Sequence, residues 1–191
     1  MAQGYRLVST DYWKQKRALS HITPGADRWP EGEDFPNWLA GALPGIVLEF
    51  GCGTGRLARG FSPNRYIGVD VSPHALELAV AAAPDYDFRL IAEHDVLPKA
   101  DAAFAHTVLL HVPDLDLPAV VSRLAVAAPR VLVSEIMGRR WRRTGNPPVY
   151  NREPEAYVEA FAGADMTRGR RWVRPYHRYG GVELTALEFV R

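Results

Sequence analysis

The residues best suited to chemistry begin in the stretch "IVLEFGCGTG" at positions 46–55. Its apolar start followed by Gly51, Gly53 and Gly55 predicts a buried strand that ends in a tight glycine turn. Such a turn lets a ligand touch bare backbone, and we expect a following helix to present unpaired N–H groups there. Asp70 ends the next strand-like run, where a carboxylate can accept both hydroxyls of a ribose. Together these features predict a site for an adenosine-type ligand.

The spacing and charge of this loop argue against a dinucleotide. A dinucleotide fingerprint reads G-x-G-x-x-G, whereas Arg56 and Leu57 follow the glycines here. Glu49 precedes the first glycine by two residues, and its negative charge would repel a diphosphate. The loop therefore favours a ligand that carries positive charge.

Two segments, "VLEFGCGTGRL" and "YIGVDVS", resemble the first two motifs of class I S-adenosylmethionine-dependent methyltransferases of the small-molecule type. S-adenosylmethionine has a sulfonium and an ammonium group and no phosphate, which agrees with the charge of the loop. The resemblance continues through "LIAEHDVLPKADAAFAHTVLLHVPD" and "NREPEAYVEAFAGA" and spans about residues 44–191. It implies methyl transfer to a small molecule, with an anionic and an aromatic metabolite as the two options and S-adenosyl-L-homocysteine as product.

The resemblance also implies which residues hold the cofactor. They are Glu49, Gly51, Cys52, Gly53, Asp70, Val71, Asp95, Val96 and Thr107. The glycine loop would lie along the methionine portion, Glu49 would order the loop or meet the ammonium, and Val71 would pack on the adenine. Asp95 and Val96 would border the adenine edge, although Glu93 could occupy the place of the aspartate. Thr107 would leave the fourth strand beside the transferred methyl.

Methyl transfer from a sulfonium is an in-line displacement, so the protein mainly aligns the reactants and excludes water. An acceptor of high pKa also needs a base to take its proton. Candidates at the carboxyl edge of the expected sheet are His106, His111, Glu135 and Tyr150, of which His106 is preferred. One cysteine offers no pair of thiolates for zinc, and we expect no metal site.

Strand and helix patterns alternate from residue 46 onward, which predicts a parallel sheet covered on both faces. The expected strands are 46–50, 65–70, 87–92, 101–106 and 130–137, followed by 170–176 and 182–190. The last two are joined by a short turn at "YGG", which permits only an antiparallel pair. Expected helices follow Thr10 or Asp11, cover about 34–42, follow the glycine loop, and begin after Ser72, Asp116 and Asn151.

These elements add up to an α/β, Rossmann-like, seven-stranded, mostly parallel sheet with an antiparallel C-terminal strand. At 191 residues the chain should form one methyltransferase domain, with residues 1–43 as an N-terminal helical cap and 44–191 as the core. The resemblance implies that the acceptor pocket and lid are built from the N-terminal segment and the loop after the fifth strand, which hold Tyr12, Trp13, Trp29, Trp141 and Tyr150. We expect Trp13 and Trp141 in the pocket, and ordinary packing stays the alternative for these aromatic residues. The order of elements thus brings the cap and the strand ends to one site.

The bulk composition limits the partners. A net charge of +1 gives no general attraction to nucleic acid or anionic lipid, so we expect neither. With 47% hydrophobic residues, no apolar stretch of bilayer length and no signal-peptide pattern, we expect a cytoplasmic protein. The oligomeric state stays open.

Two sequence features invite other interpretations. "NPPVY" at 146–150 resembles the motif of amino-group methyltransferases, but it follows the fifth strand instead of the fourth, which favours a proline-stiffened loop. Arginines crowd into 138–143 and 168–178, either as solvated side chains or as groups that recognise a carboxylate or phosphate of the acceptor, with Arg139, Arg140 or Arg143 at the mouth of the site. An RNA or protein methyltransferase, a non-catalytic cofactor-binding protein and a nicotinamide-dependent reductase remain alternatives.

Overall fold

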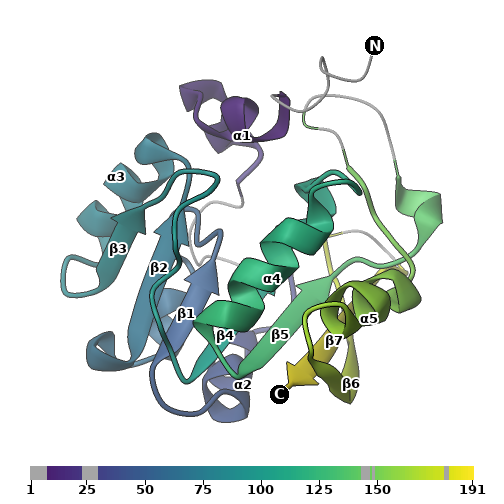
Figure 1. Ribbon diagram of the computed structural model, residues 1–191. Helices are drawn as coiled ribbons and strands as arrows, with labels where there is room; N and C mark the ends of the chain where they lie inside the picture. Colours follow the sequence, from purple (N-terminus) through teal and green to yellow (C-terminus); the bar gives the residue numbers. More distant parts are fainter. Residues whose placement is uncertain (1–7, 23–29, 143–146, 148, 179–180) are drawn as a thin grey trace.

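The chain forms a seven-stranded sheet with helices on both faces. This computed structural model describes residues 8–22, 30–142, 147, 149–178 and 181–191. Trp29 and Arg143, two of the residues expected near the site, lie outside these ranges, as does part of the "NPPVY" loop. Figure 1 shows the strands side by side with α4 and α5 across the front of the sheet.

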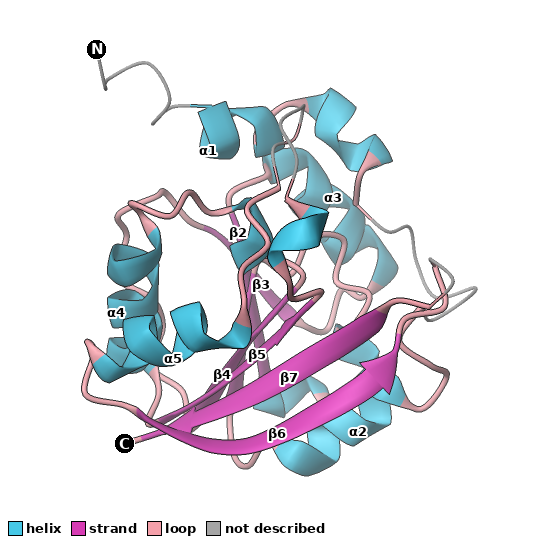
Figure 2. Ribbon diagram, turned by 90° about the vertical axis from the view of Figure 1, so that its right-hand side faces the viewer, coloured by secondary structure: helices cyan, strands magenta, loops and turns pink. Residues whose placement is uncertain are grey.

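The sheet has the strand order β3-β2-β1-β4-β5-β7-β6. Its strands are β1 (Val47–Phe50), β2 (Tyr66–Asp70), β3 (Asp87–Leu90), β4 (Ala102–His106), β5 (Arg130–Glu135), β6 (Thr167–Pro175) and β7 (Glu183–Val190). The neighbours from β3 to β5 pair in parallel, whereas β7 runs antiparallel to both β5 and β6. The expected mostly parallel sheet with an antiparallel C-terminal strand is confirmed, and Figure 2 shows β6 and β7 as a long ribbon at one edge.

The α-helices are α1 (Val8–Trp13), α2 (Phe35–Ala42), α3 (Pro73–Ala82), α4 (Leu117–Ala127) and α5 (Pro154–Ala162). Short 3-10 helices connect them: η1 (Lys16–Ser20), η2 (Ala58–Gly60), η3 (Pro63–Arg65), η4 (Leu109–His111) and η5 (Arg139–Trp141). Ser72 caps α3 as its sequence predicts, since the side-chain hydroxyl accepts a hydrogen bond from the N–H of Ala75 at 3.3 Å.

Each face of the sheet has its own apolar core. On one face, α4 and α5 bury side chains such as Val121 and Phe161 against Leu48 and Val131 of the sheet. On the other face, α2 buries Phe35 and Leu39 among side chains from β1, β4 and β5. Because parallel strands place their carboxyl ends at one edge, this packing fixes the ends of β1, β2, β4 and β5 near one another.

Three local expectations were wrong. A 3-10 turn, η2, follows the glycine loop in place of an α-helix; its Gly60 packs so closely on α2 that a Cβ there would lie 2.4 Å from the carbonyl oxygen of Pro36. The first helix is Val8–Trp13, so it includes Thr10 and Asp11 instead of following them, and the chain continues as η1. Glu153, and not Asn151, is the N-cap of α5, because the amide of Asn151 donates to the carbonyl oxygen of Ile136.

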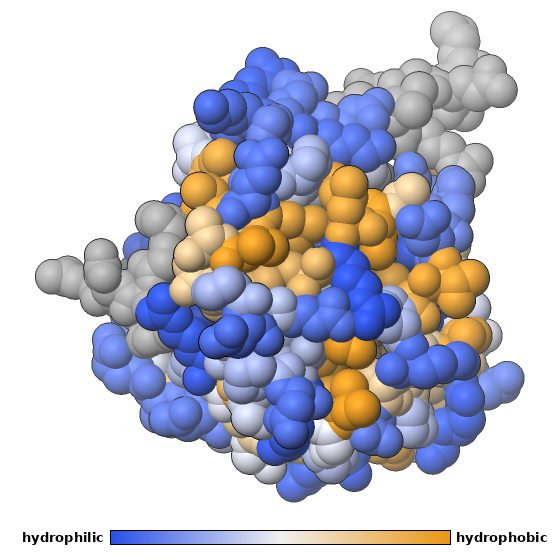
Figure 3. Space-filling view, turned by 90° about the vertical axis from the view of Figure 1, so that its left-hand side faces the viewer, coloured by the Kyte–Doolittle hydropathy of each residue, from blue (hydrophilic) through white to orange (hydrophobic). Residues whose placement is uncertain are grey.

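The β3 edge of the sheet exposes several apolar side chains. Leu90 of β3 and Leu78 and Val80 of α3 are about half exposed. Figure 3 views the side of the molecule that carries these two elements and shows apolar patches between hydrophilic ones. Among the described residues, no helix is both long and apolar enough to cross a bilayer.

Candidate functional site

A cavity of about 360 Å³ lies at the carboxyl ends of the central strands. It is lined from β1 and its glycine loop, from the ends of β2 and β4, from η4, and from α1 with the chain that follows η1. Ligands of open α/β sheets bind at this edge, where the strand order reverses on either side of β1. The topology therefore places the cavity where the sequence predicts the ligand.

The glycine loop is folded tightly against its neighbours. Gly51 has a φ of +76°, and a Cβ there would lie 2.5 Å from the Cγ2 atom of Val108. Only glycine fits, since this conformation is costly for other residues and the space is already filled. The loop is thus a fixed wall of the cavity.

Four N–H groups of this loop are used within the protein. Those of Gly51 and Cys52 donate to the carbonyl oxygen of Val69 at 2.8 and 3.0 Å, and that of Gly55 donates to Cys52. The N–H of Gly53 donates to Oδ2 of Asp70 at 2.8 Å. No α-helix begins after the loop, so the expected helix N-terminus does not form there. These four N–H groups are therefore not available to a phosphate.

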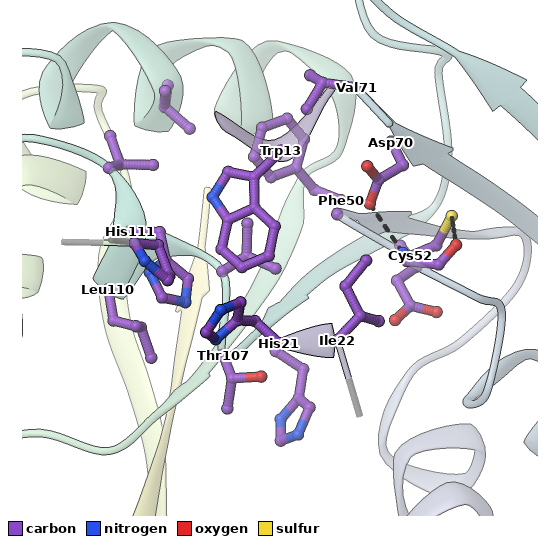
Figure 4. Close-up of a pocket in the computed structure, with 18 of the residues that line it drawn as sticks. Trp13, His21, Ile22, Phe50, Cys52, Asp70, Val71, Thr107, Leu110 and His111 are labelled. Atoms are coloured by element: carbon purple, nitrogen blue, oxygen red, sulfur yellow. Dashed lines mark hydrogen bonds between the residues drawn. The ribbon is translucent and has the colours of Figure 1, made fainter. Parts of the chain in front are cut away.

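Asp70 joins the end of β2 to the glycine loop. Besides the bond from Gly53, its Oδ1 accepts a hydrogen bond from the N–H of Ser72 at 2.8 Å. Burial raises the pKa of Asp70, and these backbone hydrogen bonds partly offset the rise. Figure 4 shows the carboxylate beside Cys52, with a dashed line to the loop. Each oxygen keeps a further lone pair with which it can accept a ligand hydroxyl.

Glu49 is a buried acid in the wall of the same cavity. The Tyr66 hydroxyl donates to Oε2 of Glu49. Burial raises the pKa of Glu49 to about 8, against the opposing effect of the Tyr66 hydrogen bond and the charge of Arg56. A cation that enters the cavity would favour the ionised form of this carboxyl.

Residues from the N-terminal segment lie across the cavity. The ring of Trp13 meets that of His111 edge to face, with centroids 4.8 Å apart, as Figure 4 shows. Ile22 lies directly against the glycine loop, since a Cβ on Gly53 would be 3.1 Å from its Cγ2 atom. The segment thus covers the loop with apolar and aromatic side chains, which exclude water.

At the end of β4, His106 joins a buried chain of polar groups. Its Nε2 lies 2.7 Å from Oε1 of Glu31, and Arg56 binds both oxygens of Glu31 at 2.7 and 3.2 Å. Burial alone raises the pKa of Glu31, but the hydrogen bond and charge of His106 and the charge of Arg56 outweigh it and hold that pKa far below its usual range. Burial lowers the pKa of His106, and Glu31 only partly offsets this.

The next residue, Thr107, lines the cavity in a strained conformation with a φ of +53°. A β-branched residue in the left-handed region is uncommon and costs about 1–3 kcal/mol. Its N–H donates to the carbonyl oxygen of Ser134 at 2.9 Å, which fixes the turn. The strain lies at the cavity wall, where strained residues are often functional.

Glu135 and Arg152 hold η4 from opposite sides. Oε1 of Glu135 accepts from the N–H groups of Val108 and Leu109 at 3.0 and 2.7 Å. Arg152 donates to the carbonyl oxygens of Leu109 and Val112. Burial raises the pKa of Glu135 to about 8. Glu135 lies behind η4 and does not line the cavity, so it fixes the turn that carries His111 and is not placed to act as a base.

Most of the expected site residues come together. Those that line the cavity are Glu49, Gly51, Cys52, Gly53, Asp70, Val71, His106, Thr107 and His111, with Trp13 and Trp141. Asp95, Val96 and Tyr150 do not line it. Asp95 folds back to accept a hydrogen bond from the N–H of Ala92, and the side chain of Val96 is 84% exposed. Arg142 lies over the ring of Tyr150, and Tyr12 packs beneath Trp13 outside the cavity.

Other lining residues were not expected or were only alternatives. Glu93 lines the cavity, whereas Asp95 does not. The sequence had left open that Glu93 could take the place expected for Asp95. Arg56 and Tyr176 also line it, and Glu31 stands behind His106. No sequence signal marks Glu31, because its partners are 25 and 75 residues away.

The arginine clusters lie largely away from the cavity. Arg139 and Arg140 do not line it, and Arg142 pairs with Asp114 at 2.8 Å. Arg170 pairs with Glu188, and Arg178 is the member of the second cluster that reaches the cavity. In the described ranges, no three metal-ligating side chains gather as a metal site.

Residues 48–128, from β1 to the end of α4, match the family model described as "Methyltransferase domain". No protein of curated function matches the sequence. Among solved structures, magnesium protoporphyrin IX methyltransferase (ChlM) from Synechocystis PCC 6803 with bound SAM is similar with a TM-score of 0.71 and 20% identity, over 97% of this chain and 96% of that chain. The DhpI-SAM-HEP complex is similar with a TM-score of 0.67 and 22% identity, over 96% and 98%.

A third similar structure is the 1,6-didemethyltoxoflavin-N1-methyltransferase of Burkholderia thailandensis with bound 1,6-didemethyltoxoflavin and S-adenosylhomocysteine. Its TM-score is 0.65 at 20% identity, over 82% of this chain and 76% of that chain. These likenesses show the fold, and with the domain match they confirm both the resemblance read from the sequence and the expected fold class.

Proposed function

We propose that this chain, with its methyltransferase domain and class I methyltransferase fold, transfers a methyl group from S-adenosylmethionine to a small-molecule acceptor. The similar structures that contain SAM or S-adenosylhomocysteine support this cofactor. One observation on this chain carries the proposal: two buried carboxyl groups, Glu49 and Asp70, flank a glycine loop in which the N–H groups of all three glycines are bonded within the protein. Such a site suits a ligand with hydroxyls and positive charge and disfavours a phosphate.

The donor set fits the cofactor residue by residue. Asp70 accepts the ribose hydroxyls, and Glu49 meets the ammonium group. Val71 packs on the adenine, and Glu93 takes the place at its edge that Asp95 does not occupy. When bound, S-adenosylmethionine supplies an already activated methyl group. The chain then has to align the acceptor and exclude water, which Trp13 and Ile22 favour by covering the loop.

A small acceptor agrees with the shape of the site. The N-terminal segment lies across the cavity, whose volume of about 360 Å³ is within the range of small-molecule pockets. We propose that residues 1–43 and 44–191 act as one domain, with α1 and the chain that follows η1 as the part that covers the ligand. A cytoplasmic location and the absence of nucleic-acid partners remain predictions.

Calorimetry with S-adenosylhomocysteine tests the cofactor assignment. We expect binding by the natural chain and weaker binding by Asp70→Asn and Asp70→Ala, with Asp87→Ala as a matched control, because Asp87 pairs with Arg89 outside the cavity. Asp70→Asn separates the loss of the carboxylate charge from misfolding, because the amide oxygen of asparagine can still accept one of the two backbone hydrogen bonds. Unchanged affinity in both Asp70 variants would show that the ribose assignment is wrong.

Incorporation of labelled methyl tests the reaction. Transfer to small molecules supports the proposal, whereas transfer only to RNA or protein would show that the methyl acceptor is a macromolecule. Binding without any transfer would indicate a cofactor-binding protein. Thermal stabilisation by NADH but not by S-adenosylhomocysteine would indicate a reductase.

A further inference from the structure

The charged residues of the cavity wall come from different parts of the sheet. The four acidic residues that line it are Glu49 in β1, Asp70 in β2, Glu93 after β3 and Asp116 before α4. The strands β5, β7 and β6 lie on the other side of β1, beyond β4. Among the described lining residues that follow position 123, Arg178 is the one charged side chain, and it lies between β6 and β7. This side of the cavity therefore carries a cation.

Two other arginines of the wall hold parts of the protein together. Arg56 binds both oxygens of Glu31 at 2.7 and 3.2 Å. The guanidinium of Arg123 donates to two carbonyl oxygens of the turn after β3, at 2.5, 2.6 and 3.0 Å. These two side chains serve the fold of the loops, whereas Arg178 reaches the cavity from the opposite side of the sheet.

Backbone and side-chain bonds place Arg178 at the cavity. The N–H of Tyr176 donates to the carbonyl oxygen of Val182 at 2.8 Å, and the N–H of His177 donates to that of Pro30 at 2.6 Å. Burial raises the pKa of Tyr176, and Arg178 opposes this rise through its charge and through a hydrogen bond between the two side chains. The guanidinium of Arg178 thus lies at the hydroxyl of a tyrosine that itself lines the cavity.

The wall beside Tyr176 is largely apolar. Ile136 and Trp141 pack against Tyr176, and all three line the cavity with Val149. Arg178 itself is exposed, so a ligand in the cavity can reach it. An arginine binds a carboxylate or a phosphate through two parallel N–H groups. This part of the cavity therefore suits a small molecule with an apolar body and an oxyanion.

We propose that the methyl acceptor carries an oxyanion, either a carboxylate or a phosphate-type group, and that Arg178 binds this group and so selects the acceptor. This inference rests on the proposed function and names its substrate class. It gives to Arg178 the role that the sequence suggested for Arg139 or Arg140, which do not line the cavity. An anionic acceptor is also attracted by the positive sulfonium of S-adenosylmethionine.

Calorimetry with matched probes, on protein saturated with S-adenosylhomocysteine, tests the inference. The probes are benzoate, phenylphosphonate and benzamide, which share a phenyl ring for the apolar wall and differ in the group that Arg178 would meet. We expect the natural chain to bind at least one of the two anions about 10-fold or more tightly than benzamide, as a charge-assisted hydrogen bond provides. The anion that binds more tightly distinguishes a carboxylate from a phosphate-type acceptor.

Variants test the role of Arg178 itself. Arg178→Met should remove the preference for the anion, and Arg178→Lys should keep part of it, because the charge remains and the two parallel N–H groups are lost. Arg170→Met is the matched control, since Arg170 pairs with Glu188 on β7 and does not line the cavity. All three variants should bind S-adenosylhomocysteine as the natural chain does. A merely structural role would weaken the three probes alike and leave the ratio of anion to amide affinity unchanged.

The remaining outcomes also decide. Equal affinity for benzamide and both anions, or no binding of either anion, would overturn the proposal, as would an anion preference that survives in Arg178→Met. If Arg178→Met instead loses affinity for S-adenosylhomocysteine, Arg178 binds the carboxylate of the cofactor and its role toward the acceptor is wrong. Failure of the natural chain to bind S-adenosylhomocysteine would refute the proposed function itself.

Discussion

The buried carboxyl of Glu49 should make cofactor binding depend on pH in a way that can be worked out in advance. Burial raises the pKa of Glu49 to about 8 in the protein without ligand contacts. If the ammonium of the ligand binds ionised Glu49, the protein must lose this proton on binding. At pH 7 only about one-tenth of the molecules carry ionised Glu49, which costs about 1.4 kcal/mol of binding free energy relative to full ionisation.

The sign follows from the direction of the shift. Because the pKa falls on binding, the affinity rises with pH up to about 8 and levels off above it. Provided that the bound carboxyl stays ionised at pH 6, the affinity should increase roughly 50-fold from pH 6 to pH 8. The ammonium of the ligand remains protonated across this range, so Glu49 sets the slope.

Calorimetry with S-adenosylhomocysteine in buffers of different ionisation enthalpy measures both quantities. At pH 7 we expect the release of about 0.9 proton per ligand bound. Glu49→Gln should bind with an affinity that does not change between pH 6 and pH 8 and should release no proton. Glu135→Gln is the matched control, because Glu135 has the same pKa of about 8 but does not line the cavity. A flat profile in the natural chain, or an undiminished slope in Glu49→Gln, would refute the reasoning.

Two further predictions concern stability. Gly51→Ala should lower the free energy of unfolding by about 1–3 kcal/mol, because the φ of Gly51 is +76° and the added Cβ meets Val108. The control is Gly41→Ala, where a Cβ has open space, so this variant should be neutral or stabilising. Equal denaturation midpoints for the two variants would contradict the prediction. The pKa of Glu135 is raised to about 8 in the folded state, so the folded state binds more protons than the unfolded one between about pH 4.5 and pH 8, and stability should fall as pH rises through that window. Glu135→Gln should reduce this fall by a few kcal/mol, while the contribution of Glu49, whose pKa is also about 8, remains. Urea titrations of both chains at pH 5 and pH 8 measure the difference, and an equal fall in the variant would contradict the assignment.

The sequence by itself determined the order of elements and most of the cavity wall at the glycine loop. Apolar runs and turn residues locate every strand, and Glu49, Gly51 and Asp70 are recognisable because a loop between adjacent strands holds its functional residues at short, regular spacing. Local pattern failed where packing overrides it, as at Gly60, whose contact with α2 leaves η2 where a helix was expected.

Only the tertiary structure decided what surrounds His106 and which later residues reach the cavity. Glu31 reaches His106 across 75 positions, and no periodicity or motif encodes such a meeting. In the structure, Asp95 and Tyr150 do not line the cavity, and Glu135 accepts hydrogen bonds from the backbone at η4. The positions of all three along the chain had made them candidates for the site. Sequence spacing fixes which residues share a strand end, whereas the direction of each side chain depends on packing between elements that are far apart in the chain.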